Sequence, residues 1–403
     1  MDAFFASVEL LRFPQLADAP VIIGGGRLNV ADWMARLNTR LPLHLGRPWG
    51  DDGEGGQADL ARIPLDQFPR LSDYKGRGVI TTATYPARAF GVGSAMGMMK
   101  AAKLCPQAIW LPADFDRYRD YSRRFKAEIL RLAPVMENRG VDEVFIDFTD
   151  VPGGQDDAGA ALAQRLQAAI RQATGLTCSI GVAPNKLLAK MASEFNKPNG
   201  IAIVQAGDLQ TRIWPLPCRK INGIGPKSDA ALASHGIGTI GELAAADPAW
   251  LCERFGERHG SWLHRAAWGR DDRPVETSSE PVSMSRETTF SRDLHAVNDK
   301  AELGAIFTRL CEQVAGDLAR KGFVGRTVGI KLRYDDFRIV TRDQSLPQPV
   351  QDAAAIRRVA GQCLKRVDLS RRLRLLGVRV SALRRADEAQ DEAVGRGESL
   401  PLF

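Results

Sequence analysis

The sequence predicts an α+β protein built from a mixed domain, a helical segment and a second mixed domain of basic character. Three observations lead to this class. Helical stretches alternate with short β-branched runs over residues 78–204, residues 205–272 carry helical patterns throughout, and residues 281–384 alternate again between helix and strand. The 403 residues, 44% hydrophobic and 26% charged, suffice for two to four domains with cores of their own.

The first domain, residues 1–204, is expected to enclose a small, mainly antiparallel sheet. Apolar periodicity predicts its elements, which are helices over 6–16, 116–132, 158–173 and from 185 onward, and strands over 20–23, 78–82, 141–148 and 178–182. Residues 27–77 break this pattern, because they are rich in glycine and mixed charge and carry Trp33 and Trp49. We interpret them as an inserted, partly flexible loop.

The helical segment, residues 205–272, contains a glycine turn between two short helices. Gly223 and Gly225 form this turn, and Lys227 follows it. Such a turn exposes backbone amides at a helix N-terminus, where they can hold a DNA phosphate. The run resembles a helix-hairpin-helix, which binds a nucleic-acid backbone without regard to sequence. An ordinary tight turn between helices is the alternative.

A polar linker is predicted at residues 273–280, ahead of a basic domain over residues 281–384. This domain holds 20 Lys and Arg against 11 Asp and Glu, whereas the whole chain carries a net charge of +7. We expect a helix over 300–321 and strands over 327–334 and 374–383. An excess of positive charge favours a polyanion partner such as nucleic acid, although a merely solvated surface gives the same count. Residues 385–403 predict a disordered tail.

Several classes of protein are disfavoured by what the sequence lacks. No apolar run is long enough to cross a membrane, and the N-terminus has neither the basic lead nor the apolar core of a signal peptide. The six cysteines are scattered without a Cys-x-x-Cys pair, and the five histidines do not cluster. These features favour a reduced cytoplasmic protein rather than a disulfide framework or a zinc site.

Two adjacent acids, Asp142 and Glu143, stand inside an apolar, strand-forming run. On a regular strand their side chains would point to opposite faces. Just after a turn, which residues 138–140 can supply, both can face one cavity and hold a divalent cation for phosphoryl transfer. The alternative is an exposed hairpin that carries two solvated acids.

Three further stretches carry groups suited to a nucleoside triphosphate. Thr84, Tyr85 and Arg88 follow a strand and offer a hydroxyl, a phenol and a guanidinium to phosphate oxygens. Lys197 follows a helix that Asn185 is expected to cap, at a turn with Pro and Gly. The aromatic pair Phe4-Phe5 opens the chain. A surface stack, a solvated helix end and plain core packing are the respective alternatives.

The order of these motifs resembles the Y family of DNA polymerases, in its DNA polymerase IV (DinB-like) branch. The matching stretches span nearly the whole chain apart from residues 27–77, and they are residues 1–9, 84–92, 141–147, 181–200 and 221–225. The resemblance implies a right-hand polymerase with palm and small fingers over 1–204 (fingers about 3–112), a helical thumb over 205–272 and an α/β little-finger domain over 281–384 that grips DNA.

The resemblance also implies the activity and the roles of the site residues. The expected activity is low-fidelity, DNA-templated DNA synthesis across lesions, with two Mg2+ ions held by Asp142 and Glu143. Phe4, Phe5, Thr84, Tyr85, Arg88 and Lys197 would bind the incoming dNTP, with Phe5 as the steric gate that rejects a ribose. Gly223, Gly225 and Lys227 would contact DNA.

The implied partners are primer–template DNA, dNTP and a sliding clamp. Leu400, Leu402 and Phe403 resemble the anchors of the peptide that such polymerases insert into the clamp, and a frayed terminus is the alternative. We expect a monomer without membrane contact, located in the bacterial cytoplasm and associated with the nucleoid.

One departure from the family concerns the first metal ligand. The family carries an aspartate just before the Met-Asp that opens this sequence, and Asp2 matches the second acid, which is not the usual ligand. Either the sequence starts at an internal methionine or one of three metal carboxylates is absent, so the chain as written is expected to polymerise poorly. Two rivals follow: a catalytically silent adaptor recruited to the clamp, and a repair protein that binds DNA through the helix-hairpin-helix alone.

Overall fold

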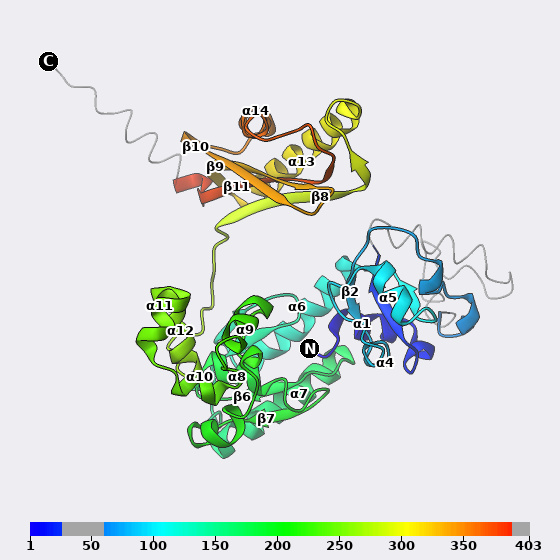
Figure 1. Ribbon diagram of the computed structural model, residues 1–403. Helices are drawn as coiled ribbons and strands as arrows, with labels where there is room; N and C mark the ends of the chain where they lie inside the picture. The colour runs from blue at the N-terminus through cyan, green and yellow to red at the C-terminus, as the bar shows by residue number, and fades with distance from the viewer. Residues whose placement is uncertain (26–59, 389–403) are drawn as a thin grey trace. The chain divides into compact units, whose positions relative to one another are not determined.

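Three small sheets and a set of helices make up the first part of the chain. The computed structural model describes residues 1–25 and 60–388, which fall into two compact units, Met1–Ser278 and the residues from Ser279 onward. Figure 1 shows the elements of each unit. Each unit is described by itself.

The elements of the first unit up to residue 203 alternate short strands with helices. In chain order they are α1 (Phe4–Arg12), β1 (Val21–Gly24), β2 (Ile80–Ala83), α4 (Tyr85–Arg88), α5 (Met98–Leu104), β3 (Ile109–Leu111), α6 (Phe115–Leu132), β4 (Met136–Asn138), β5 (Val144–Ile146), α7 (Ala160–Thr174), β6 (Ile180–Val182), α8 (Lys186–Ala192) and β7 (Ile201–Ile203). The helices α1, α6 and α7 bury apolar stripes in one core with β1 and β3.

The sheets of this unit differ from the single, mainly antiparallel sheet that the sequence predicts. The described strands form one sheet in the order β2-β1-β3 and two pairs, β4-β5 and β6-β7. The pairings of β1 with β2 and of β4 with β5 are antiparallel, whereas β1 with β3 and β6 with β7 are parallel. The apolar runs are too short for their periodicity to reveal which strand is the partner.

The predicted loop over 27–77 is wrong for residues 60–77, the part that the structure describes. Residues 60–77 include two short 3-10 helices, Leu65–Gln67 and Leu71–Asp73, and bury Phe68 and Tyr74 in the domain cores. Prolines, charges and irregular spacing hide these apolar anchors from a test for periodicity. Residues 27–59, with Trp33 and Trp49, lie outside the described residues.

Residues 205–272 are helical, as predicted. They comprise a 3-10 turn (Ala206–Asp208), a π-helical turn (Leu209–Ile213), a second 3-10 turn (Cys218–Lys220), α9 (Pro226–Ala233), α10 (Ile240–Ala245), α11 (Pro248–Phe255) and α12 (Glu257–Ala267). Thr239 and Glu242 form a capping box at the start of α10. The buried residues of this segment share a core with Leu187 and Leu188 of α8, so the helical segment packs directly on the element that leads to Lys197.

The second unit is an antiparallel sheet with helices packed on it. Its elements are β8 (Ser283–Leu294), α13 (Lys300–Lys321), β9 (Phe323–Tyr334), β10 (Ile339–Val350), α14 (Ala353–Leu364) and β11 (Leu373–Arg385), and the strand order is β10-β9-β11-β8. Both helices contribute to the one core of this unit. The helix over 300–321 and two of the strands are confirmed, whereas β8, β10 and α14 were not predicted.

Candidate active site

Asp142 and Glu143 lie in the bend between β4 and β5, before the regular alternation of the strand begins. The bend is closed by the Arg139 amide, which donates a hydrogen bond to the Glu143 carbonyl oxygen at 3.1 Å. Both acidic side chains are half-buried and line the same cavity. The bend joins the antiparallel pair β4-β5, and in it two neighbouring acids line one cavity, as expected after a turn; the Glu143 side chain is still 38% exposed.

A second cavity, of about 350 Å³, brings together residues that are far apart in the sequence. It is lined by Met1, Ala3, Phe4, Phe5, Thr81, Thr82, Tyr85, Arg88, Ser94, Asp142, Glu194 and Lys197. Five of the predicted nucleotide-binding residues are in this set, and Asp142 lines both cavities. Cationic, phenolic and carboxylate groups thus share one space of a size suited to a small phosphorylated ligand.

Tyr85 and Arg88 project from the short helix α4, directly after β2. The Arg88 guanidinium carbon lies 5.0 Å from the centre of the Tyr85 ring, and Nε donates to the carbonyl oxygen of Ala83 at 3.0 Å. One nitrogen edge of the guanidinium is therefore fixed while the rest can face a ligand. Burial, followed by the charge of Asp2, raises the pKa of the Tyr85 phenol, so the phenol remains a hydrogen-bond donor at neutral pH.

Thr84 does not join this cavity, contrary to the prediction. Its side chain is buried, its hydroxyl oxygen accepts from the Val21 amide at 3.0 Å, and its hydroxyl donates to the Ala19 carbonyl oxygen at 3.2 Å. The hydroxyl therefore fastens the start of β1 and is not available to phosphate. Thr84 was predicted to bind phosphate because it precedes Tyr85 in the sequence, but its side chain points away from the cavity. Thr81 and Thr82 line the cavity instead.

Phe5 is held on an aromatic platform. Its ring stacks on Tyr118 with centroids 4.3 Å apart and an angle of 22° between the rings, and Phe115 meets it edge-on at 5.8 Å. Tyr118 is fully buried and its hydroxyl donates to Glu9 at 2.7 Å. Burial raises the pKa of both Tyr118 and Glu9. Phe4, by contrast, is a core residue. Only 3% of it is exposed, and this small part borders the cavity.

Lys197 lies on the turn after α8, and a chain of alternating charges leads from it to Glu143. Lys197 pairs with Glu194 at 2.5 Å, and Lys190 lies 3.9 Å from Glu194 and 2.7 Å from Glu143. Asn185 caps α8 by accepting from the Leu188 amide, as predicted. Glu194 and Lys190 were not predicted as site residues. They become part of the site only because folding brings them next to Lys197 and Glu143.

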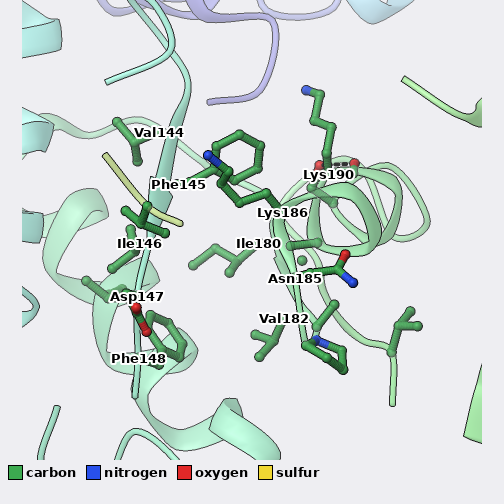
Figure 2. A pocket seen from close by; sticks show the side chains of 18 of the residues that line it. Val144, Phe145, Ile146, Asp147, Phe148, Ile180, Val182, Asn185, Lys186 and Lys190 are labelled. Carbon is green, nitrogen blue, oxygen red and sulfur yellow. Dashed lines mark hydrogen bonds between the residues drawn. The ribbon is translucent and has the colours of Figure 1, made fainter. Parts of the chain in front are cut away.

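The larger cavity, of about 740 Å³, lies between β5 and β6. Figure 2 shows apolar side chains of both strands, such as Phe145, Ile146 and Val182, directed into it. Each of these strands pairs on one side only among the strands that the structure describes. The Met1 ammonium lies at this cavity and donates to the Asp142 carbonyl oxygen at 2.9 Å.

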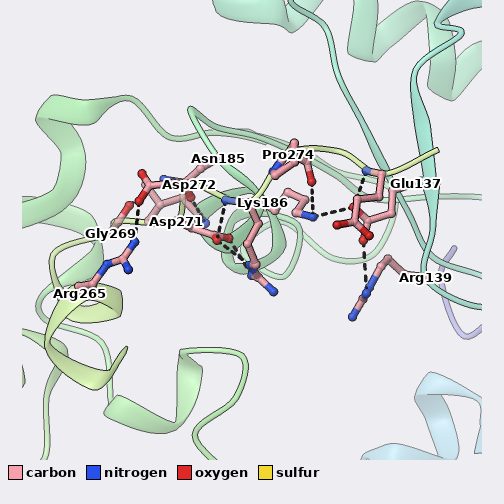
Figure 3. Close-up of polar contacts among 12 residues, drawn as sticks. Glu137, Arg139, Asn185, Lys186, Arg265, Gly269, Asp271, Asp272 and Pro274 are labelled. Atoms are coloured by element: carbon pink, nitrogen blue, oxygen red, sulfur yellow. Dashed lines mark hydrogen bonds and ion pairs between the residues drawn. The ribbon is translucent and has the colours of Figure 1, made fainter. Parts of the chain in front are cut away.

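A buried polar network fastens the segment after α12 to β4 and α8 (Figure 3). The Lys186 ammonium donates to Glu137 at 2.6 Å and to the Pro274 carbonyl oxygen at 2.6 Å, and the Glu276 amide donates to the same carboxylate at 3.1 Å. Burial opposes ionisation of Glu137, but the Lys186 and Glu276 hydrogen bonds outweigh it and lower the pKa of Glu137. The first half of the predicted linker, 273–280, is therefore bound to α8 and β4.

The predicted DNA-binding residues of the helical segment are exposed. Gly225 precedes α9 as its N-cap and Lys227 stands in its first turn. Gly223 has a φ of 117°, and a Cβ there would lie 2.7 Å from the Trp262 ring, so only glycine fits. The predicted clamp anchors Leu400, Leu402 and Phe403 lie outside the described residues.

The donor set at the acidic pair suits a hard divalent cation. Two carboxylates at one cavity supply oxygen ligands of the type that Mg2+ takes. Within residues 1–25 and 60–388, no group of three or more His, Cys, Asp or Glu side chains is placed to hold a metal ion. Asp142 and Glu143 therefore fit a cation that takes its remaining oxygens from water, from the phosphates of a ligand or from a further carboxylate.

Among the residues that the structure describes, no helix is long and apolar enough to cross a membrane.

Models of known families match three parts of the chain. The impB/mucB/samB family matches residues 57–194, and the C-terminal domain of that family matches residues 281–393. The helix-hairpin-helix motif of the same family matches residues 206–237, which include the turn at Gly223 and Gly225.

Curated relatives match nearly the whole chain. DNA polymerase IV of Caulobacter vibrioides is 37% identical over 388 residues, which are 96% of this chain and 83% of the relative. DNA polymerase IV of Halorhodospira halophila is 36% identical over 397 residues, 97% of this chain and 96% of the relative. DNA polymerase IV of Methanoculleus marisnigri is 36% identical over 383 residues, which are 95% of this chain and 92% of the relative.

Solved structures agree in fold. A Y-family DNA polymerase chimera of Dbh and Dpo4 covers 94% of this chain and 96% of its own, with a TM-score of 0.73 and 22% identity. An insertion ternary complex of Dbh DNA polymerase has the same coverage and identity and a TM-score of 0.60. At this identity the likeness concerns the fold alone.

Proposed function

The chain belongs to the impB/mucB/samB family, the Y-family DNA polymerases, and on that premise we propose that the cavity lined by Phe5, Tyr85, Arg88 and Lys197 binds the incoming dNTP. The protein is a DNA-directed DNA polymerase of the low-fidelity translesion class. The comparisons give no support to the silent adaptor, nor to a repair protein that works through its helix-hairpin-helix alone.

Positioning and charge neutralisation supply the chemistry of this site. Arg88 and Lys197 are the cations that face the space beside Asp142, and Tyr85 adds a donor that burial keeps protonated. They would bind the triphosphate and hold its α-phosphorus near the acids. Y-family polymerases are metal-dependent, and we assign Asp142 and Glu143 as the ligands of two Mg2+ ions, which would activate the primer 3′-OH and neutralise charge on the phosphates.

Sugar selection is assigned to Phe5. The ring lines the nucleotide cavity from a fixed position, because Tyr118 lies flat beneath it and Phe115 closes one edge. A 2′-hydroxyl would meet this ring, whereas a deoxyribose leaves the contact open. The role is that of a steric gate.

DNA contacts are assigned to the thumb and to the basic second unit. Gly223, Gly225 and Lys227 present an exposed turn and a cation to the phosphate backbone, and residues 281–384 carry an excess of nine positive charges, 20 Lys and Arg against 11 Asp and Glu. Leu400, Leu402 and Phe403 are proposed as anchors for a sliding clamp. We take the working form to be a monomer at the bacterial nucleoid.

One observation carries the proposal: side chains from α1, α4, the bend before β5 and the turn after α8 converge on one cavity. The test is steady-state primer extension by the Arg88→Ala and Lys197→Ala variants. Each is expected to raise KM for dNTP about tenfold or more while leaving the Kd for primer–template DNA within about twofold. Arg131→Ala, an exposed cation outside the cavity, is the matched control. Equal KM values in all three variants would exclude this cavity as the dNTP site.

A further inference from the structure

Asp2 is a buried carboxylate that the assignments above leave without a role. Its residue is 2% exposed, and it lines neither of the two cavities described above. Burying a carboxylate is costly unless its oxygens are hydrogen-bonded, so its partners indicate what the charge does.

Both oxygens of Asp2 are bound, and to two different segments. Oδ1 accepts from the Ser179 hydroxyl at 2.7 Å, and Oδ2 accepts from the Asn199 backbone amide at 2.8 Å. The Asp2 amide also donates to the Thr177 carbonyl oxygen at 3.1 Å. Asp2 therefore ties the N-terminal segment both to the residue before β6 and to the turn that follows Lys197.

The turn after Lys197 needs such a tie. Asn199 has a φ of 56°, in the left-handed region that L-residues rarely adopt. Gly200 is crowded as well, since a Cβ there would lie 2.0 Å from the Asn196 carbonyl oxygen. The Asp2 hydrogen bond to the Asn199 amide satisfies a donor that this backbone conformation turns toward the buried carboxylate.

We propose that Asp2 is a positioning residue for the triphosphate, acting through the turn that carries Lys197. The proposal rests on the assignment of Lys197 to the dNTP site. With the turn fixed by Asp2, the Lys197 ammonium starts from a defined place at the edge of the cavity, and its pairing with Glu194 at 2.5 Å can be exchanged for a phosphate oxygen. Without Asp2 the turn relaxes, and the lysine loses that place.

Two substitutions separate this role from others. Asp2→Leu keeps the branched shape and the number of side-chain heavy atoms but removes both acceptors. Asp2→Asn keeps a hydrogen bond to each of the two segments, because its amide oxygen can accept from the Asn199 amide while its NH2 donates to the Ser179 hydroxyl oxygen. A positioning role through hydrogen bonds predicts that asparagine restores what leucine loses. A role as a charge or a metal ligand predicts that both fail.

The experiment combines steady-state kinetics on the full chain with a double-mutant cycle. Asp2→Leu is expected to raise KM for dNTP about tenfold with kcat changed less than about threefold, and Asp2→Asn to stay within about threefold of the parent. In a Lys197→Ala background, Asp2→Leu should add less than about twofold. An unchanged KM in Asp2→Leu, an equal loss in Asp2→Asn, or the same tenfold loss without Lys197 each overturns the proposal.

Hydrogen exchange supplies a readout that needs neither activity nor nucleotide. Peptides that cover residues 196–200 should exchange about tenfold faster in Asp2→Leu than in Asp2→Asn, while peptides of α6 stay unchanged. Equal exchange rates in the turn would show that Asp2 does not hold it. If Lys197→Ala alone leaves KM unchanged, the assignment of Lys197 under the proposed function fails, and the consequence for dNTP fails with it.

Discussion

Removing the Lys186 side chain tests how firmly the segment after α12 is fastened to β4 and α8. The Lys186 and Glu137 side chains are 9% and 8% exposed, and the ammonium also donates to the Pro274 carbonyl oxygen. Lys186→Met leaves the Glu137 carboxylate buried with its main counter-charge gone. The Glu276 amide and the exposed Arg139 still contact it, and the charge of Arg273 still acts on it.

The size of the effect follows from this burial. Removing one partner of a buried ion pair costs about 3–5 kcal/mol, because the other charge stays behind without compensation. For a unit of this size 1 kcal/mol corresponds to a shift of about 2–4 °C in Tm. Lys186→Met is therefore expected to lower the Tm of the first unit by about 6–20 °C. Lys186→Met combined with Glu137→Gln removes both charges and should recover at least about half of that loss.

Differential scanning calorimetry of the full chain measures this prediction, with limited proteolysis of residues 274–280 as a second readout. Arg139→Met is the matched control, since its side chain is 52% exposed and water screens its charge, so its loss is expected to cost about 0–1 kcal/mol. The reasoning is refuted if Lys186→Met costs no more than Arg139→Met, or if adding Glu137→Gln lowers Tm further.

Two other outcomes are expected. Phe5→Ala should raise the ratio of ribonucleotide to deoxynucleotide incorporation in primer extension about tenfold or more. Tyr118→Phe removes the hydrogen bond that holds the Tyr118 ring to Glu9, and it should raise the same ratio by a smaller factor. Unchanged ratios would show that Phe5 is not the steric gate. Because the pKa of Glu137 lies below its ordinary 4.5, its ionised form stabilises the fold above that pH, and this stability is lost as the pH falls through the lowered pKa. Unfolding by acid should therefore be steeper in the parent than in Glu137→Gln, and identical Tm-against-pH curves would contradict this.

Much of the fold follows from local pattern. The amphipathic stripe of α6, the cap at Asn185 and the glycine turn at Gly223 all appear where the sequence indicates. Strand β10 was missed because its burial does not alternate clearly and it carries two prolines at the edge of its sheet. The pairing of strands depends on contacts between distant residues, which periodicity does not encode.

The site was predicted from residue type and turn chemistry, which indicate Asp142, Arg88 and Lys197. The structure places these residues at the cavities, and their roles stay predictions. It was mispredicted at Thr84, where the strand directs the hydroxyl into the backbone of residues 19–21. The residues that support the site gave no signal in the sequence. Tyr118 reads as an ordinary core residue of a helix until the fold places Phe5 on its ring.

The central claim is that Asp142 and Glu143 form the catalytic pair of a DNA polymerase, and Asp142→Ala tests it most directly. Primer extension with dNTP and Mg2+ is measured beside the Kd for primer–template DNA, with Asp150→Ala, an exposed acid outside the cavities, as the control. We expect Asp142→Ala to lose at least about a thousandfold in rate with DNA binding within about twofold of the parent, and Asp150→Ala to match the parent. Extension by Asp142→Ala at the rate of Asp150→Ala would contradict the account.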